Sequence, residues 1–189
     1  MGVDIYGRNP KIVGDAPTIE YDKATEEEKS KYFEELEKWE DENPGYYFRS
    51  NWWGWRPIVH MVEEACIDCG IDVETSSWQY NDATGPETQE ECDKIADALE
   101  RFIEHNRGDD TDENDRVNLC LGMWCTMDGT FLDKDMEAKL NEQYPIGTVH
   151  IGSIVTPDGS IVSSAHGTSY SRVKQFITFL RNCGGFQVF

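Results

Sequence analysis

Residues 46–57 of the sequence combine aromatic rings with guanidinium groups. Arg49 and Arg56 flank three tryptophans in this segment, although the whole chain has only eight arginines. Pro57 suits the first turn of a helix, and a helix N-terminus offers unpaired backbone N–H groups with partial positive charge. Aromatic faces, guanidinium groups and a helix N-terminus together suit a flat anionic ligand such as a nucleotide. We therefore predict a ligand-binding site that consists of Tyr47, Arg49, Asn51, Trp52, Trp53, Trp55, Arg56, Trp78 and Tyr80.

The same segment also has a purely structural interpretation. Alternate residues between Tyr47 and Asn51 would place one face of a strand against the interior. The tryptophans would then fill the core beside the following helix, and an exposed group of them would instead suit a protein contact or a sugar. The sequence leaves the core interpretation and the binding interpretation open.

Thiols and histidines offer weaker chemistry. Cys66 and Cys69 have C-x-x-C spacing but fall at the end of a predicted helix, where the helix dipole disfavours a thiolate. Zinc would need two further ligands, and no second C-x-x-C pair exists, so we predict buried thiols with neither a metal nor a cofactor. His60 could act as a general base beside the aromatic segment, which keeps a small hydrolase as one alternative. Phosphate-loop, dinucleotide-binding and zinc-protease motifs do not occur, and an enzyme is not favoured.

The charge of the chain is strongly negative. The 189 residues include 17 Lys+Arg and 37 Asp+Glu, for a formal charge of −20. This charge repels nucleic-acid phosphates and anionic membranes, so we expect no direct binding to nucleic acid. Residues 20–42 and 87–115 together hold 23 of the acids. The simpler interpretation of these two acidic segments is that they form solvated helix faces. The alternative is that the protein is an acidic inhibitor that imitates nucleic acid and binds a host protein with a basic surface.

The apolar pattern predicts an α+β fold. Helices are expected at 25–42, 57–69, 87–107, 133–141 and 170–182, strands at 2–6 and 117–124, a hairpin of 148–155 with 160–164, and an edge strand at 186–189. Strands and helices do not alternate regularly, which favours one mainly antiparallel sheet packed with about four helices. We expect a single globular domain over 1–189. No apolar run could span a membrane and no secretory signal is recognised, so a cytoplasmic location is expected.

Several motifs resemble a group of small proteins from bacteria and their phages. They are Met-Gly-Val-Asp-Ile-Tyr-Gly at the start, Tyr-Phe-Arg-Ser-Asn-Trp-Trp-Gly-Trp-Arg-Pro in the middle and Phe-Leu-Arg-Asn-Cys-Gly-Gly-Phe at the end. The resemblance implies no activity, cofactor or catalytic residue, and it favours a phage or mobile-element origin. The acidic segments 20–43 and 108–115 fall outside these motifs, and we interpret them as candidate insertions. We expect a non-enzymatic protein that binds a small anionic ligand or a protein segment.

Overall fold

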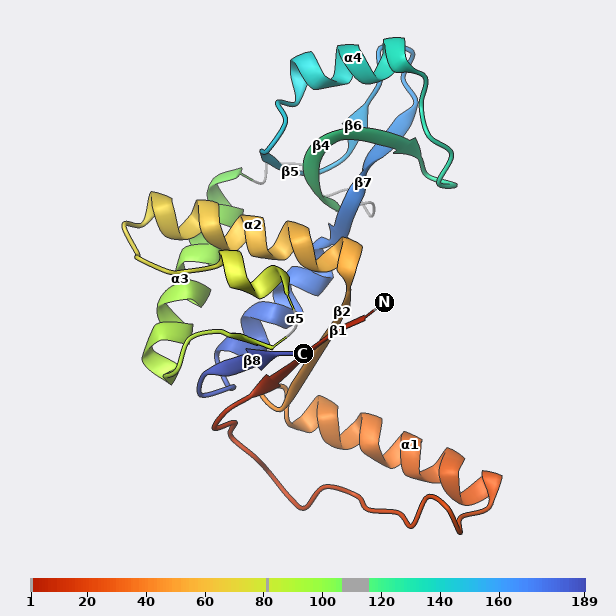
Figure 1. The fold of residues 1–189 in the computed structure, drawn as a ribbon, viewed down its shortest axis with the longest axis vertical. Coiled ribbons are helices and arrows are strands. Elements are labelled where there is room, and N and C mark those ends of the chain that lie inside the picture. The colour runs from red at the N-terminus through yellow and green to blue at the C-terminus, as the bar shows by residue number, and fades with distance from the viewer. Residues whose placement is uncertain (1, 81, 107–115) are drawn as a thin grey trace.

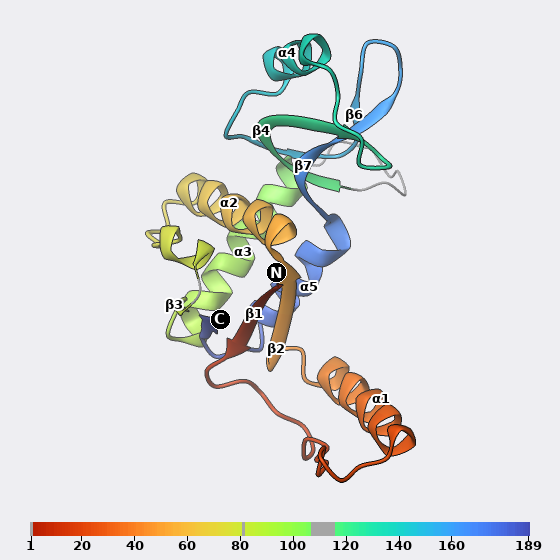
Figure 2. The ribbon, with the colours of Figure 1, turned by 45° about the vertical axis from the view of Figure 1, so that its right-hand side comes forward.

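The computed structural model describes residues 2–80, 82–106 and 116–189, and this part of the chain forms five α-helices and two four-stranded antiparallel sheets. The α+β prediction is therefore confirmed. Figures 1 and 2 show three regions in series: the second sheet with α4, then a middle region of α2, α3, α5 and the first sheet, then α1. The elements are β1 (Gly2–Gly7), α1 (Glu26–Glu42), β2 (Tyr47–Asn51), α2 (Trp52–Asp68), a 3-10 helix η1 (Ser76–Gln79), β3 (Ala83–Thr84), α3 (Gln89–Asn106), β4 (Arg116–Thr126), α4 (Lys134–Gln143), β5 (Val149–Ile151), β6 (Ile154–Val155), β7 (Ile161–Ser169), α5 (Tyr170–Leu180) and β8 (Phe186–Val188).

The first sheet has the strand order β2-β1-β8-β3. β8 was predicted as an edge strand, but it pairs with both β1 and β3 and lies inside the sheet. The turn before β8 makes this possible because Gly184 and Gly185 both adopt positive φ, at 63° and 96°. Opposite residues on β1 and β2 include Asp4 and Arg49, which places both side chains on the same face.

The second sheet has the strand order β5-β4-β7-β6, so the expected single sheet is corrected to two. The predicted hairpin is right for β6 and β7, where Ile154 lies opposite Val162. The predicted strand 148–155 is interrupted, however, and β5 pairs with β4 instead. Gly152 makes the break, because it adopts φ 120° and its N–H donates to the Arg116 carbonyl at 2.8 Å.

The main core lies between the first sheet and α2, α3 and α5. Trp55 is fully buried there, and its indole N–H donates to the Trp78 carbonyl at 2.8 Å. A smaller core beneath α4 is built from Trp124 and Leu140 with three neighbours. Each sheet thus packs on its own hydrophobic core. The helix α2 connects the two sheets, because its residues contact β7 and β4 as well as the main core.

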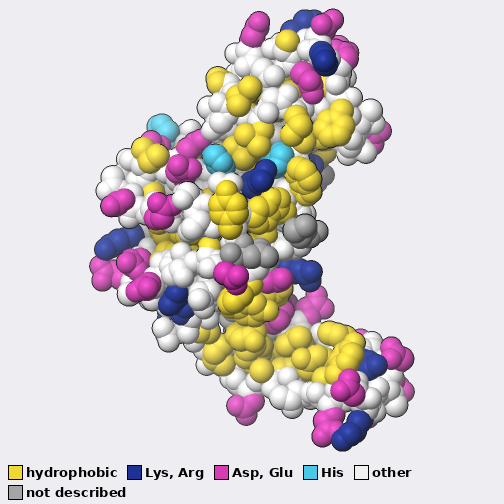
Figure 3. Space-filling view, in the orientation of Figure 1, with side chains coloured by type: hydrophobic (Ala, Val, Ile, Leu, Met, Phe, Trp, Pro, Cys, Tyr) yellow, Lys and Arg dark blue, Asp and Glu magenta, His cyan; other side chains and the backbone are white. Residues whose placement is uncertain are grey.

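The helix α1 projects away from the rest of the molecule (Figures 1 and 2). Thr25 and Glu28 form a capping box at its start. Trp39 is its one buried residue and packs edge-on against Tyr46, with ring centroids 4.9 Å apart. Figure 3 shows apolar side chains gathered along the hollowed side between α1 and the second sheet. The other candidate insertion, 108–115, lies outside the described residues.

Among the described residues, every helix is too short or too polar to cross a membrane.

Candidate functional site

The structure separates the residues that were predicted to form one aromatic and arginine site. Trp55 and Trp78 lie in the core with 0% and 1% of their surface exposed, so their side chains have no face to offer a ligand. Trp55 is buried because it lies on the apolar face of α2, and Trp78 is the buried residue of the 3-10 helix η1. Tyr80 is at the opposite extreme, with 69% of its surface exposed. The Tyr47 hydroxyl donates to the Asp4 carboxylate beside Arg49.

Trp52, Trp53 and Arg56 gather around His166 of β7 instead. The Arg56 guanidinium lies 5.5 Å from the centre of the Trp52 ring, and its Nη1 lies 3.4 Å from His166 Nε2. The half-exposed Trp53 ring lies over the imidazole, with centroids 4.7 Å apart. Burial, and then the Arg56 charge, lower the pKa of His166 from its ordinary 6.5. This cluster therefore holds a neutral histidine between α2 and the second sheet.

Lowering the pH below about 6.5 is expected to destabilise the protein through this histidine. In the unfolded chain, His166 takes up a proton near pH 6.5, whereas in the folded protein it does so only at a lower pH. Below pH 6.5 the folded state therefore binds fewer protons than the unfolded state. The free energy of unfolding then falls by at most about 1.4 kcal/mol per pH unit. Urea denaturation between pH 7.5 and 5.5 measures the slope. His166→Gln should reduce the slope without abolishing it, because burial also lowers the pKa of His150. The slope should stay the same in His105→Gln, an exposed change on α3, and an unchanged slope in His166→Gln would contradict the assignment.

Two strands lead directly into helices at a common place. α2 begins at Trp52, five residues before the predicted start, because Asn51 caps it: Oδ1 accepts from the Gly54 N–H at 2.7 Å. α5 follows β7 in the same way, since Ser169 Oγ accepts from the Arg172 N–H at 3.2 Å. The cap residue and the third residue of each helix line one cavity. Two helix N-termini, each with partial positive charge, therefore meet there.

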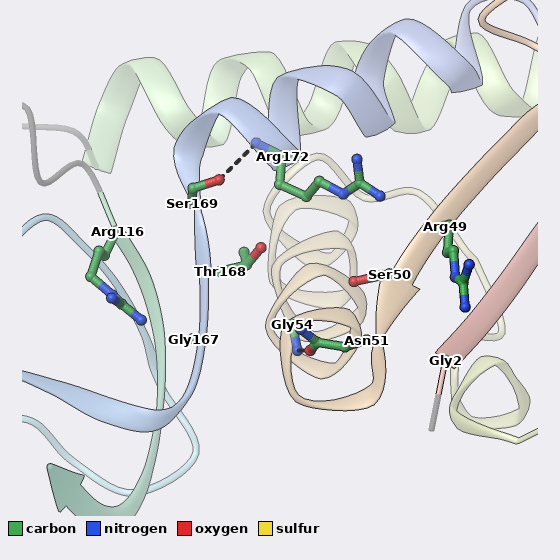
Figure 4. A pocket seen from close by; sticks show the side chains of 10 residues that line it. All are labelled: Gly2, Arg49, Ser50, Asn51, Gly54, Arg116, Gly167, Thr168, Ser169 and Arg172. Atoms are coloured by element: carbon green, nitrogen blue, oxygen red, sulfur yellow. Dashed lines mark hydrogen bonds between the residues drawn. The ribbon is translucent and has the colours of Figure 1, made fainter. Parts of the chain in front are cut away.

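This cavity has a volume of about 660 Å³ and is lined by three arginines from three different elements (Figure 4). Arg49 comes from β2, Arg116 from the start of β4 and Arg172 from the first turn of α5. We call it the arginine pocket. The other lining residues are small or polar: Gly2, Ser50, Asn51, Gly54, Gly167, Thr168 and Ser169. Of the predicted site residues, Arg49 and Asn51 line it.

The pocket glycines leave room for polar atoms to come close. A Cβ placed on Gly54 would lie 3.3 Å from Asn51 Oδ1, 3.3 Å from Ser50 Oγ and 3.5 Å from Thr168 Oγ1. These distances mean that three oxygen atoms surround the bare α-carbon of Gly54. A Cβ placed on Gly2 would lie 3.4 Å from Nε and Nη2 of Arg49, and a Cβ placed on Gly167 would lie 3.5 Å from Nη2 of Arg116.

The pocket arginines have few acidic partners in a chain that is rich in acids. Arg181, which lies elsewhere, contacts three carboxylates, at 2.6, 2.8 and 3.9 Å. Arg49 is 3.7 Å from Asp4, whereas Arg116 and Arg172 have no ion pair within the described part of the chain. Arg172 lies over the Phe48 ring at 4.5 Å, and burial lowers the pKa of its guanidinium. Among the described residues, Asp4 is thus the one carboxylate that forms an ion pair with a pocket arginine.

The other candidates for chemistry are placed apart from the arginine pocket. Cys66 is buried near the end of α2, and burial, followed by the nearby Cys69, raises its pKa to about 11. A thiol with that pKa is protonated at neutral pH and is a poor nucleophile or metal ligand. His60 lies further along α2, with Nδ1 4.0 Å from Glu63 Oε2. The described residues contain no cluster of three ligands that could hold a metal ion.

Sequence reasoning missed most of the arginine pocket. Arg116, Thr168, Ser169 and Arg172 lie more than 55 residues beyond Arg56, and only the folding of two sheets onto α2 and α5 brings them to β2. One signal was present: residues 143–189 hold one acid and three bases in a chain of charge −20. Comparisons with models of protein families, with curated proteins and with solved structures find no match to this chain.

Proposed function

We propose that the protein binds a small phosphate-bearing ligand in the arginine pocket. The observation that carries this proposal is the convergence of Arg49, Arg116 and Arg172 on one cavity whose described lining includes no carboxylate side chain. The chain has 37 acids and 17 bases, so a group of three guanidinium groups with a single ion pair among the described residues, Arg49 to Asp4, runs against its overall composition. A bound anion would supply the missing negative charge.

The donors in the pocket match phosphate oxygens. Guanidinium groups form paired, charge-assisted hydrogen bonds with phosphate, and such bonds contribute about 1.5–3 kcal/mol each. The N-termini of α2 and α5 add partial positive charge at the same cavity. Hydroxyl groups from Ser50, Thr168 and Ser169 can donate to further oxygens.

The size and lining of the pocket favour a small polar molecule. A volume of about 660 Å³ is within the range of about 300–1,000 Å³ that small-molecule sites occupy. Aromatic rings are missing from its described lining, so phosphate and sugar groups, not a stacked base, would carry recognition. The sequence predicted a nucleotide-like ligand beside the tryptophans. A ligand in the arginine pocket would instead be bound without Trp52 and Trp53, which do not line it.

Removing Arg172 is expected to remove ligand binding. Inorganic pyrophosphate and adenosine monophosphate should raise the melting temperature of the wild-type protein at low ionic strength, because a ligand that binds the folded state stabilises it. Arg172→Gln should abolish this shift, since it removes a half-buried charge and one of three guanidinium groups. Thermal melts over a range of ligand concentrations measure the effect.

Arg101→Gln is the matched control. Arg101 is an exposed residue of α3 that lines a different cavity together with Ala65 and Asp68, at the end of α2 opposite to the arginine pocket. Because α2 rises about 1.5 Å per residue over its 17 residues, this change lies about 20 Å or more from the arginine pocket. It alters the total charge by the same amount and should leave the ligand shift intact. A phosphate-dependent shift that is equal in the wild type and in Arg172→Gln would overturn the proposal, as would the lack of any shift across a panel of phosphates and phosphorylated sugars.

A further inference from the structure

The arginine pocket has two cationic ends. Figure 4 shows Arg116 on one side of the cavity, on β4, and Arg49 with Arg172 on the other side, on β2 and α5. Ser50, Thr168 and the Asn51–Gly54 turn lie between these ends. A single phosphate group would satisfy one end and leave the other unneutralised.

We infer that the ligand carries two phosphate groups joined by a sugar, as in a nucleoside bisphosphate or a sugar bisphosphate. This inference rests on the proposed function and specifies the chemistry of its ligand. One phosphate would bind Arg49 and Arg172, and the other would bind Arg116. The sugar would lie between them over Gly54.

The Arg116 end is prepared for an anion. The Nε atom of Arg116 is buried and has no hydrogen-bond partner among the described residues. Its Nη2 lies above Gly167, where the missing side chain leaves the guanidinium accessible from the cavity. A buried donor without a partner destabilises the folded state, and an anion bound at this guanidinium would offset that cost.

The opposite end is held in position by neighbouring side chains. Arg172 is fixed by the Phe48 ring on one side and by Gln175, whose Oε1 accepts from Nη1 at 2.6 Å. Arg49 is fixed by Asp4, whose carboxylate is also bound by the Tyr47 hydroxyl. Two guanidinium groups that are already oriented lose less conformational freedom when a phosphate binds.

The middle of the pocket suits hydroxyl groups. The three oxygen atoms that surround Gly54 come from Ser50, Asn51 and Thr168. Two of them are hydroxyls, which both donate and accept, and the third is the cap amide oxygen, which already accepts from the Gly54 N–H. Ribose hydroxyls could bond to this group, whereas an apolar linker would leave it without partners.

The test compares two ligands that differ by one phosphate. Isothermal titration of the wild-type protein should show that adenosine 3′,5′-bisphosphate binds about 30-fold more tightly than adenosine 5′-monophosphate, in keeping with one additional charge-assisted contact. Arg116→Gln should reduce this preference to about threefold or less while monophosphate binding persists. Arg101→Gln should keep the full preference.

The possible outcomes separate the two proposals. Equal affinity of both ligands for the wild type would overturn the inference and leave the proposed function standing. Failure of both ligands and of other phosphates to bind would overturn the proposed function as well. If Arg116→Gln does not fold, Arg116→Lys keeps a charge but loses the paired donors, and it should retain part of the preference; an undiminished preference in either folded variant would refute the assigned role of Arg116.

Discussion

Replacement of Trp55 by alanine is expected to lower the free energy of unfolding by about 3–5 kcal/mol, the range found for large aromatic side chains removed from a core. The indole is fully buried and packs against Phe48 and Phe176, with ring centroids 6.4 and 5.3 Å away. Its removal also leaves the Trp78 carbonyl without its 2.8 Å donor. Natural domains are stable by about 5–15 kcal/mol, so this one change would remove a large part of the total. Urea denaturation followed by circular dichroism measures it.

Tyr80→Ala is the informative comparison, because both residues were predicted to belong to one binding site. Tyr80 is 69% exposed, and its loss should change the free energy of unfolding by about 0.5 kcal/mol or less. Similar effects of the two substitutions would contradict the division of the predicted site into core and surface residues.

Most elements of the fold could be predicted because each depends on a local pattern. α3 has the predicted buried stripe from Cys92 to Ile103, and α1 begins at the capping box of Thr25. The cap of α3 was expected at Thr84 and Glu87, but the structure forms it four residues later, between Thr88 and Glu91. Helix starts were less certain where two signals competed. Pro57 indicated the start of α2, but Asn51 accepts the Gly54 N–H and begins the helix five residues earlier.

The arrangement of strands could not be derived from such local patterns. β8 is short and terminal, which is typical of an edge strand, yet it lies between β1 and β3. Its position depends on the turn at Gly184–Gly185, where the backbone packs against Asn9 and Glu87. Contacts between segments that are far apart in the sequence produce no periodic pattern from which the strand order could be predicted.

The candidate site was predicted in part for the same reason. The period-two pattern of residues 47–51 indicated a strand with one buried face but not which face, and in the structure Arg49 lies on the exposed face of β2. Its partners Arg116 and Arg172 come from other elements, and nothing in their local sequence relates them to β2. The tryptophans misled the prediction because an aromatic residue beside an arginine is equally typical of a core boundary and of a ligand platform.

Gly45→Ala is expected to destabilise the protein by about 3 kcal/mol or more, although the sequence indicates merely a helix stop at Asn43–Gly45. A Cβ on Gly45 would lie 2.2 Å from the Asn182 carbonyl oxygen and 2.3 Å from its carbon. These are backbone atoms and cannot turn aside as a flexible side chain could, so the loop before β2 must separate from the end of α5. That separation would also disturb Gly7, whose N–H donates to the adjacent Tyr46 carbonyl at 3.0 Å. Urea denaturation again gives the measurement.

Gly70→Ala separates this steric effect from the general effect of replacing a glycine. Gly70 adopts φ +66° and would place its Cβ in open space, with no atom within 4 Å. Its replacement should therefore cost about 1–2 kcal/mol from backbone strain alone. Gly45 has no positive φ, so all of its larger penalty must come from the contact with Asn182. If Gly45→Ala proved no more destabilising than Gly70→Ala, the close packing of the loop before β2 against the end of α5 would be wrong. The position of Arg49, which β2 carries to the arginine pocket, would then lose its support.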